Sequence, residues 1–412
     1  MKRREFIKKA GIATAGAPFW MGFLPENLWG QIPSGIKITE VKTIQVRSDI
    51  YVKLYTNKGV TGLGMSSVPS MELALDGAIR DIGRIIIDRD PTNIEFLWQA
   101  IFRWPRQRGG IISNAAISAI EIALWDIMGK LMDAPIYKLL GGAARDRIRL
   151  YVHIYDKTTE SVAERVEERV KEGFTVVRTG INWSDFKVMK RPWNLKLGVS
   201  LIKAMREAAG DNVDIIDDAH GLMTPTMVVE YCNAIESYRL LFIEDPVKEE
   251  NMAGLEWIQN HINVPIGIGE SNYTKFGHFR EIIFKHLANY VRPDVIWSGG
   301  ISECRKIAAM AEANFIDVSL HGGFTPVHAL AMTHISACTP NCVVQECGRY
   351  PRSQQTVDMF YGDDIKIIDG YAQLPEKPGL GCDLDEKIAV KYPYRPGTRP
   401  QMTTEDGAVM DW

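Results

Sequence analysis

The stretches that decide the fold are IIDDAH at residues 215–220, LLFIEDP at 240–246 and PIGIGE at 265–270. Each contains a short apolar run that closes on a carboxylate, and the three carboxylates are Asp218, Glu244 and Glu270. They recur at equal intervals, because 244 − 218 = 26 and 270 − 244 = 26. An acid after a strand is often only a helix N-cap, but equal spacing favours one shared site. The pattern predicts consecutive strand and helix units whose strands end in acids.

Five further apolar runs extend this pattern in both directions along the chain. The candidate strands are LYVH, TVVRT, DIIDD, LLFIE, PIGIGE, NYVRPD, DVSLH and CVVQE. Eight such units alternating with helical segments predict an α/β fold of the (β/α) barrel type. TVVRT and NYVRPD are the weakest of the runs, so a doubly wound sheet is the structural alternative.

Every candidate strand ends at or beside an ionisable residue. These residues are His153, Arg178, Asp218, Glu244, Glu270, Asp294, His321 and Glu346. In a barrel, the carboxyl ends of the strands converge on one face, where active sites lie. The same residues therefore support the barrel and predict a catalytic site.

Asp218, Glu244 and Glu270 are predicted to hold a divalent cation, because Mg²⁺ prefers carboxylate oxygens and keeps further positions for water or substrate. A substrate carboxylate bound to this cation accepts negative charge when its α-proton is removed. Proton abstraction beside a carboxylate is the expected chemistry.

His321 is the candidate base, and Asp294 would orient its ring; the alternative is a loop histidine bonded to backbone. His220 follows Asp218 by two residues, so on a strand it would point to the same side as that ligand. It is the candidate acid for a departing β-hydroxyl, which makes the reaction a dehydration. A supporting histidine with no proton role is the alternative.

The N-terminal third has a different pattern. Residues 36–64 alternate apolar and polar side chains around the turn at Asn57–Gly59, which predicts an antiparallel meander. Ser113–Met132 has helical spacing with Ser113 as a possible cap. An α+β domain is therefore expected to end near Gly141.

The first residues predict export. A basic start containing Arg3 and Arg4 precedes a modestly apolar stretch from Ala10 to Leu24, and the paired arginines resemble the twin-arginine signal of bacteria. Residues 1–31 are the predicted signal and the periplasm the predicted location, with a cytoplasmic extension as the alternative. No other segment is expected to span a bilayer.

The composition argues against some classes of partner and of metal or redox site. The 412 residues are 46% hydrophobic and carry a net charge of −3, so a nucleic-acid partner is not expected. The six cysteines form no C-x-x-C pair and are expected to be mostly buried free thiols.

Motifs spread from residue 36 to the end resemble the enolase superfamily, in its branch of mandelate racemase, muconate lactonizing enzyme and sugar-acid dehydratases. They are SAIEIALWDIMGKLMDAPIYKLLGG, IIDDAHG, LLFIEDP, GIGES, VRPDV, SGGISECRKIA, LHGG and QE at 345–346. The resemblance implies an α+β capping domain at 36–142, a modified TIM barrel at 143–370, and a C-terminal segment, 371–412, that packs back on the capping domain.

The resemblance also implies roles for individual residues. It implies Mg²⁺ on the three acids, a His321/Asp294 base, His220 as general acid and Glu346 against the substrate carboxylate. His220 and the RGG at 108–110 are similar to galactonate and mannonate dehydratases, which implies a hexonate-like acid. The expected substrate contacts are Arg178, Glu346, His153 and Arg108. A homo-oligomer is expected from the family.

The chain departs from its relatives in three places. Arg178 stands where many relatives carry a lysine base, and arginine stays protonated. In mannonate dehydratases an arginine here works with a nearby tyrosine, but Ile181–Leu197 contains none, so a tyrosine partner is not expected. GLGMSS at 62–67 and LHGGFTPVH at 320–328 also differ, which leaves specificity open.

Three functions remain possible from the sequence. The leading one is Mg²⁺-dependent dehydration of a sugar acid to a 2-keto-3-deoxy acid. A hydroxy-acid racemase or epimerase could use the same two histidines on opposite faces of the substrate. A periplasmic sugar-acid binding protein without turnover is the third possibility.

Overall fold

The computed structural model describes residues 32–180, 191–271, 274–397 and 401–410. Residues 1–31, which hold the predicted export signal, lie outside the described residues, so the signal stays a prediction. The capping domain begins with an antiparallel three-stranded sheet in the order β1-β2-β3. Its elements are β1 (Ile38–Val46), β2 (Asp49–Thr56), β3 (Thr61–Ser66), α2 (Glu72–Ile86), α3 (Ile94–Arg103), α4 (Ile111–Leu131) and α5 (Ile136–Leu139).

Two glycines allow β3 to pack directly on α4. A Cβ on Gly62 would lie 2.0 Å from the carbonyl oxygen of Ala123, and one on Gly64 would lie 2.0 Å from that of Ala119. Only glycine permits backbone approach this close. The glycines of GLGMSS are thus required by packing.

The barrel strands are all parallel and follow the chain order β4 to β11, and β11 pairs with β4 to close the ring. The strands are β4 (Arg147–His153), β5 (Val176–Thr179), β6 (Asp214–Asp218), β7 (Phe242–Glu244), β8 (Ile266–Ile268), β9 (Tyr290–Val291), β10 (Asp317–Leu320) and β11 (Cys342–Cys347). Each lies within or overlaps a predicted run. The β/α barrel with an α+β capping domain is therefore confirmed, and the doubly wound alternative is wrong.

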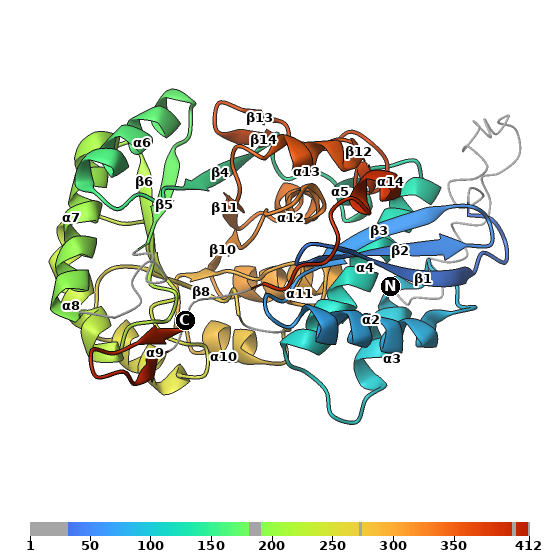
Figure 1. The fold of residues 1–412 in the computed structure, drawn as a ribbon, viewed down its shortest axis with the longest axis horizontal. Helices are drawn as coiled ribbons and strands as arrows, with labels where there is room; N and C mark the ends of the chain where they lie inside the picture. Colours follow the sequence, from blue (N-terminus) through green and yellow to red (C-terminus); the bar gives the residue numbers. More distant parts are fainter. Residues whose placement is uncertain (1–31, 181–190, 272–273, 398–400, 411–412) are drawn as a thin grey trace, which may run out of the picture. The chain divides into compact units, whose positions relative to one another are not determined.

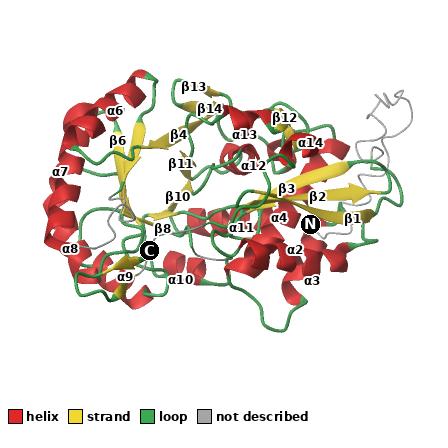
Figure 2. Cartoon of the chain, in the orientation of Figure 1, coloured by secondary structure: helices red, strands yellow, loops and turns green. Residues whose placement is uncertain are grey.

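Helices surround the strands, as Figures 1 and 2 show. They are α6 (Thr159–Lys171), α7 (Arg191–Ala209), α8 (Pro225–Ile235), α9 (Met252–Gln259), α10 (His278–Phe284), α11 (Ile301–Ala313) and α12 (Pro326–Ala337). Threonine side chains cap three of them, at Thr158, Thr224 and Thr325. Such caps satisfy backbone N–H groups that a helix cannot pair internally.

The strand register explains how acids far apart in sequence meet. Asp218 is the direct neighbour of Glu244 across β6 and β7. Because side chains alternate along a strand, Ile216 and Asp218 share a face, as do Phe242 and Glu244. Ile216 and Phe242 belong to a buried cluster with residues of β4, β5 and β11. The acids therefore lie above an apolar layer at the carboxyl end of the barrel.

Buried hydrogen bonds join the capping domain to the barrel. Trp98 Nε1 donates to the carbonyl of Gly299 at 2.8 Å, and the Gly299 N–H donates to Ser118 Oγ at 2.9 Å. Glu121 accepts the N–H groups of Ile301 and Ser302, at the start of α11. These bonds fix helices α3 and α4 of the capping domain against the segment of the barrel that precedes and begins α11.

The C-terminal part contacts both parts of the molecule. The Leu380 N–H donates to Asp126 of α4, and the Glu386 carboxylate accepts from Lys42 and Tyr55 of the capping sheet. The elements here are α13 (Gln354–Asp358), β12 (Phe360–Gly362), β13 (Ile367–Ile368), β14 (Tyr371–Gln373), β15 (Cys382–Leu384), α14 (Glu386–Ala389), β16 (Met402–Thr403) and β17 (Val409–Met410). Of these, β14 pairs with barrel strand β4. The domain boundaries given above stay a prediction.

One described helix, α4, is long and apolar enough to cross a membrane, although no such segment is predicted above. Its most apolar window is 72% buried inside the protein. The apolar character of α4 is accounted for by its position between the capping sheet and the barrel. All six cysteines are free and buried, as predicted.

Candidate active site

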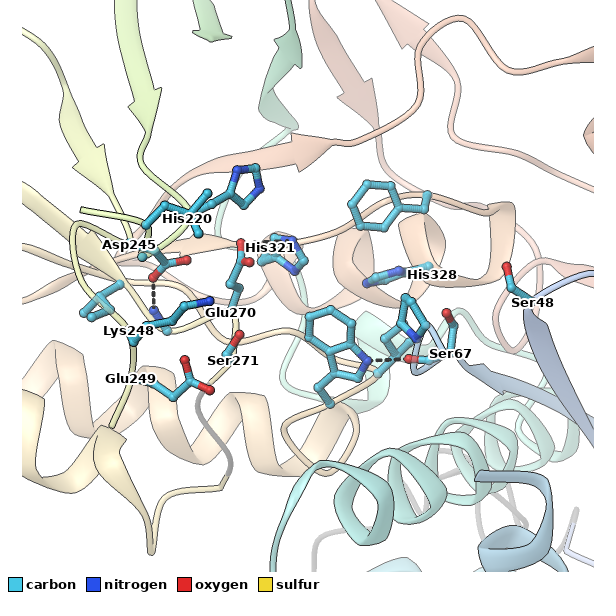
Figure 3. Close-up of a pocket in the computed structure, with 18 of the residues that line it drawn as sticks. Ser48, Ser67, His220, Asp245, Lys248, Glu249, Glu270, Ser271, His321 and His328 are labelled. Carbon is cyan, nitrogen blue, oxygen red and sulfur yellow. Dashed lines mark hydrogen bonds and ion pairs between the residues drawn. The ribbon is translucent and has the colours of Figure 1, made fainter. Parts of the chain in front are cut away.

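A cavity of about 420 Å³ opens at the carboxyl end of the barrel strands. Its walls come from the barrel, the capping domain and the C-terminal segment, which contributes Met402. Figure 3 shows His220, Asp245, Glu270 and His321 at one end and Ser48 and Ser67 at the other. Trp297 Nε1 donates to the carbonyl of Ser67 at 2.6 Å, which closes one wall between the two domains.

Three carboxylates lie together beside this cavity. Glu244, Asp245 and Glu270 each place an oxygen within 4.8 Å of the others, an arrangement that can hold a metal ion. Glu244 Oε2 has no hydrogen-bond or ion-pair partner among the described residues, whereas the corresponding oxygens of Asp245 and Glu270 face Arg292 or His321 at 3.3–3.6 Å. Buried carboxylate oxygens are normally paired, or bound to a cation. Glu244, Asp245 and Glu270 therefore fit a hard divalent cation such as Mg²⁺, and Asp218 as a ligand stays a prediction.

Two buried arginines balance this negative charge. Arg292 Nη1 lies 2.7 Å from Glu244 Oε1 and 3.6 Å from Glu270 Oε2. Arg178, at the end of β5, contacts Asp218 and lies 3.3 Å from Glu244 Oε1. Burial alone would lower the pKa of Arg178, but Glu244 and its other anionic neighbours raise it. Both arginines remain charged.

Asp218 and His220 come from one tight turn. β6 ends at Asp218, and His220 has a left-handed backbone with φ of 49°. The prediction that strand alternation puts His220 on the same side as Asp218 is therefore wrong, because His220 lies in the turn after β6 and not on the strand. His220 Nε2 nevertheless lies 2.8 Å from Asp218 Oδ2, and the ring lines the cavity. Burial and then Arg178 lower the pKa of His220 to about 4.

His321 follows β10 and is bonded on both sides. Its Nδ1 lies 2.7 Å from Asp294 Oδ2, and its Nε2 lies 3.3 Å from Glu270 Oε2. His328 Nε2 lies 3.1 Å from the other oxygen of Asp294. Asp294 thus contacts two buried histidines. Trp297 stacks on the His321 ring with centroids 5.5 Å apart.

Neighbouring carboxylates control the ionisation of His321. Burial alone would lower its pKa, but Glu346, Glu270 and Asp294 raise it to about 10. Glu346 and Asp294 lie outside the carboxylate group described above, whereas Glu270 belongs to it. A change in the charge at Glu270 therefore changes the proton affinity of His321.

Glu346, from β11, organises the opposite wall. It accepts from Tyr151 at 2.8 Å and from Arg292 at 3.1 Å, and its Oε1 lies 2.6 Å from His153 Nε2. Burial opposes its ionisation, yet His321 and His153 hold its pKa well below the usual range. Contact between Glu346 and a substrate carboxylate stays a prediction.

Arg178 has a tyrosine neighbour after all. Its Nη1 donates to the hydroxyl of Tyr155 at 3.1 Å, and that hydroxyl also contacts His153 Nδ1. Tyr155 comes from the loop after β4, not from the loop that follows Arg178 on β5. The conclusion that no tyrosine accompanies this arginine was wrong, because the partner comes from an adjacent strand.

The structure brings most of the predicted residues together, with one exception. Arg108 is exposed and its Cζ lies 5.8 Å from the ring centroid of Phe102. It lines neither described cavity. Its loop precedes α4, and its assignment as a substrate contact stays a prediction.

Sequence reasoning missed Asp245, Arg292, His328 and Tyr155. Asp245 directly follows Glu244, and Arg292 lies in VRPDV, so both were within quoted motifs. Arg292 was overlooked because a wholly buried arginine is rare unless it is paired. The second histidine of LHGGFTPVH was the available signal for His328.

Comparison with known proteins agrees with this geometry. Residues 161–388 match the enolase C-terminal domain-like family, and residues 28–141 match the N-terminal domain of the mandelate racemase/muconate lactonizing enzyme family. A D-mannonate dehydratase of Caulobacter sp. (strain K31) is 32% identical over 92% of this chain and 100% of its own length. A D-galactonate dehydratase family member of Streptomyces bingchenggensis is 32% identical over 89% of this chain and 95% of its own.

A solved structure is similar over nearly the whole chain. It is an enolase from Pantoea ananatis with bound D-gluconate and magnesium. It has a TM-score of 0.84 and 29% identity, over 91% of this chain and 99% of that one.

Proposed function

Because the chain belongs to the mandelate racemase/muconate lactonizing enzyme branch of the enolase superfamily, we propose that it is a Mg²⁺-dependent sugar-acid dehydratase. The substrate would be an aldonate-like acid and the product a 2-keto-3-deoxy acid. The observation that carries the proposal is the placement of His321 between Asp294 and Glu270, beside the carboxylate group. The sugar acids named for the similar proteins support the substrate class.

Asp218, Glu244 and Glu270 would hold the cation, with Asp245 as the adjoining carboxylate. Glu244 offers an oxygen that has no partner among the described residues, and Glu244, Asp245 and Glu270 place oxygens within 4.8 Å of one another. Bound there, Mg²⁺ would neutralise the charge that develops on the substrate carboxylate. Arg178 and Arg292 would keep the surrounding acids ionised and in place.

His321 would remove the α-proton through Nε2. Asp294 holds Nδ1 at 2.7 Å, which leaves Nε2 as the nitrogen free to exchange a proton. The raised pKa depends partly on Glu270. Compensation of that charge, as expected for a metal ligand, lowers the proton affinity of the ring toward the range in which it can act as a base.

His220 would protonate the departing 3-hydroxyl, because it lines the same cavity from the end of another strand. Arg178, His153 and Glu346 would position the substrate. The two histidines also favour a second candidate, an epimerase or racemase in which His220 and His321 exchange protons on opposite faces.

A product assay distinguishes these candidates. The mature protein with Mg²⁺ is tested against aldonic, aldaric and uronic acids, with His321→Asn as control. Loss of water with a semicarbazide-reactive keto acid supports dehydration. Exchange of the α-proton with D₂O without a keto product supports epimerisation instead. If no acid turns over while some raise the melting temperature, the protein is a binding protein.

Location and assembly are further proposals. The Arg3–Arg4 pair supports export to the periplasm by the twin-arginine route. A homo-oligomer is proposed from the family.

A further inference from the structure

A second cavity of about 380 Å³ adjoins the active site. Phe324 and Arg349 line both cavities, so the two share a wall. His153 and Tyr155 also line the second cavity, and they contact Glu346 and Arg178 of the active site. A group bound in the second cavity would therefore lie close to the reacting part of the substrate.

Three arginines line this cavity. Arg47, Arg349 and Arg352 contribute guanidinium groups, and no aspartate or glutamate is among the described residues that line it. Arg352 is held by Asp364 at 2.5 Å and donates to the carbonyl of Gly323 at 3.1 Å. Arg47 lies over the ring of Tyr392. The cavity is suited to an anion, because arginine binds carboxylates and phosphates with directed hydrogen bonds.

Arg47 has a left-handed backbone conformation. Arg47 has φ of 54° at the turn between β1 and β2, a conformation that favours glycine or asparagine. Its N–H donates to the Tyr392 carbonyl at 3.2 Å, and its carbonyl accepts from Arg395 at 3.2 Å. Because glycine also adopts this conformation, the guanidinium can be removed by substitution to glycine without straining the turn.

We propose that this arginine-lined cavity binds a second anionic group of the substrate. The inference rests on the proposed function and makes its substrate class narrower: a sugar acid with two negative charges. One end would lie at the carboxylate group that includes Glu270, and the other at Arg47 and Arg349. The second anion would be either the terminal carboxylate of an aldaric acid or that of a uronic acid unit attached to an aldonic acid.

Matched substrates test the proposal in the Mg²⁺-loaded protein. Gluconate, galactonate and mannonate are compared with the hexarates of the same configuration, and an aldonate bearing a glucuronosyl unit with one bearing a glucosyl unit. At least one dianion should show a kcat/KM about tenfold or more above its monoanionic partner, as one hydrogen bond to a charged group would give. Preference for hexarates, or for the glucuronosyl compound, identifies the source of the second anion.

Binding is measured separately by calorimetry, so that the anion site can be tested even if no substrate turns over. If the protein dehydrates monoanions as well as dianions, the inference is overturned and the proposed function stands. If nothing turns over but dianions bind at least tenfold more tightly, the proposed function fails and the anion site stands. Equal binding of both classes, or binding of inorganic phosphate alone, overturns the anion site for substrate.

Arg47→Gly removes the guanidinium while suiting the left-handed backbone, so the melting temperature should not fall. The ratio of kcat/KM between dianion and monoanion should fall about tenfold, through KM for the dianion. Arg239→Gly is the matched control, because Arg239 also has a left-handed φ, of 50°, is exposed, and lies before β7 at the opposite end of the barrel. Arg349→Gln should resemble Arg47→Gly. An unchanged ratio in both cavity variants contradicts the proposal.

Discussion

Asp294 lies 2.7 Å from His321 and, through its other oxygen, 3.1 Å from His328. One carboxylate therefore holds two rings that both line the active-site cavity. Burial opposes ionisation of Asp294, but the two histidines hold its pKa at about 2. This arrangement leaves His321 Nε2 directed toward the site of chemistry.

His321→Asn should lower kcat by at least about 10²-fold, because a general base contributes roughly 10² to 10⁴. The exchange of the substrate α-proton with D₂O should disappear with it. Asp294→Asn should give a smaller loss in the same direction, since it removes only the orienting group. Turnover and exchange that survive in His321→Asn would contradict the assignment of the base.

Chelation of the cation should abolish turnover, and added Mg²⁺ should restore it. Glu270→Gln should weaken Mg²⁺ binding measured by calorimetry by at least about tenfold, since it removes one charged ligand. Asp218→Asn should weaken binding more than Asp245→Asn, if Asp218 is the third ligand. The reverse order would assign that place to Asp245, which lies in the carboxylate group with Glu244 and Glu270.

Arg292→Met should destabilise the fold by about 3–5 kcal/mol, because it leaves buried carboxylates without their counter-charge. Arg292 has no exposed surface and contacts Glu244, Glu346 and Tyr151. Urea unfolding measures the change, and Arg239→Met on the surface is the control. A loss under 1 kcal/mol would mean that the neighbouring acids are protonated in the folded protein.

His334 should make stability depend on pH. Burial lowers its pKa from 6.5 to about 4, and both ring nitrogens are used in the neutral form, toward the Tyr137 N–H and the Leu380 carbonyl. Its stabilising contribution is complete above pH 6.5 and is lost as the pH falls to about 4, by roughly 3 kcal/mol. Urea unfolding of wild type and His334→Gln across this range should show a shallower dependence in the variant. His286→Gln, at an exposed histidine, should keep the wild-type dependence.

Gly64→Ala should destabilise the capping domain by more than about 2 kcal/mol, because the new Cβ would overlap the Ala119 carbonyl. Gly77→Ala is the matched control. Gly77 lies in α2 with no atom within 4 Å of the added Cβ, so this change should stabilise the helix by about 0.5–1 kcal/mol. Thermal unfolding of both variants checks the prediction. Equal effects would show that β3 and α4 can move apart.

The periodic pattern was enough to predict the barrel. Runs such as DIIDD and LLFIE are short, apolar and evenly spaced, and their spacing leaves room for one connecting helix between consecutive strands. The same pattern predicted that Glu244, Glu270 and His321 would lie on one face. The start of α4 was less well predicted, because the helix begins at Ile111 and Ser113 is not its cap.

Contacts between elements could not be predicted in this way. Three contacts join segments that are distant in sequence. Tyr155 pairs with Arg178, Arg292 lies among four acids, and Met402 lines the active-site cavity. No local pattern reports such contacts, since they depend on barrel closure and on the path of the C-terminal segment.

The sequence by itself determined the strand ends and their chemistry, because strand periodicity and the polarity of the terminal residues are local properties. Only the tertiary structure decided which oxygens lack hydrogen bonds, which arginines balance them, and that a second, arginine-lined cavity adjoins the first. Those properties arise from distances across the closed barrel and between its loops.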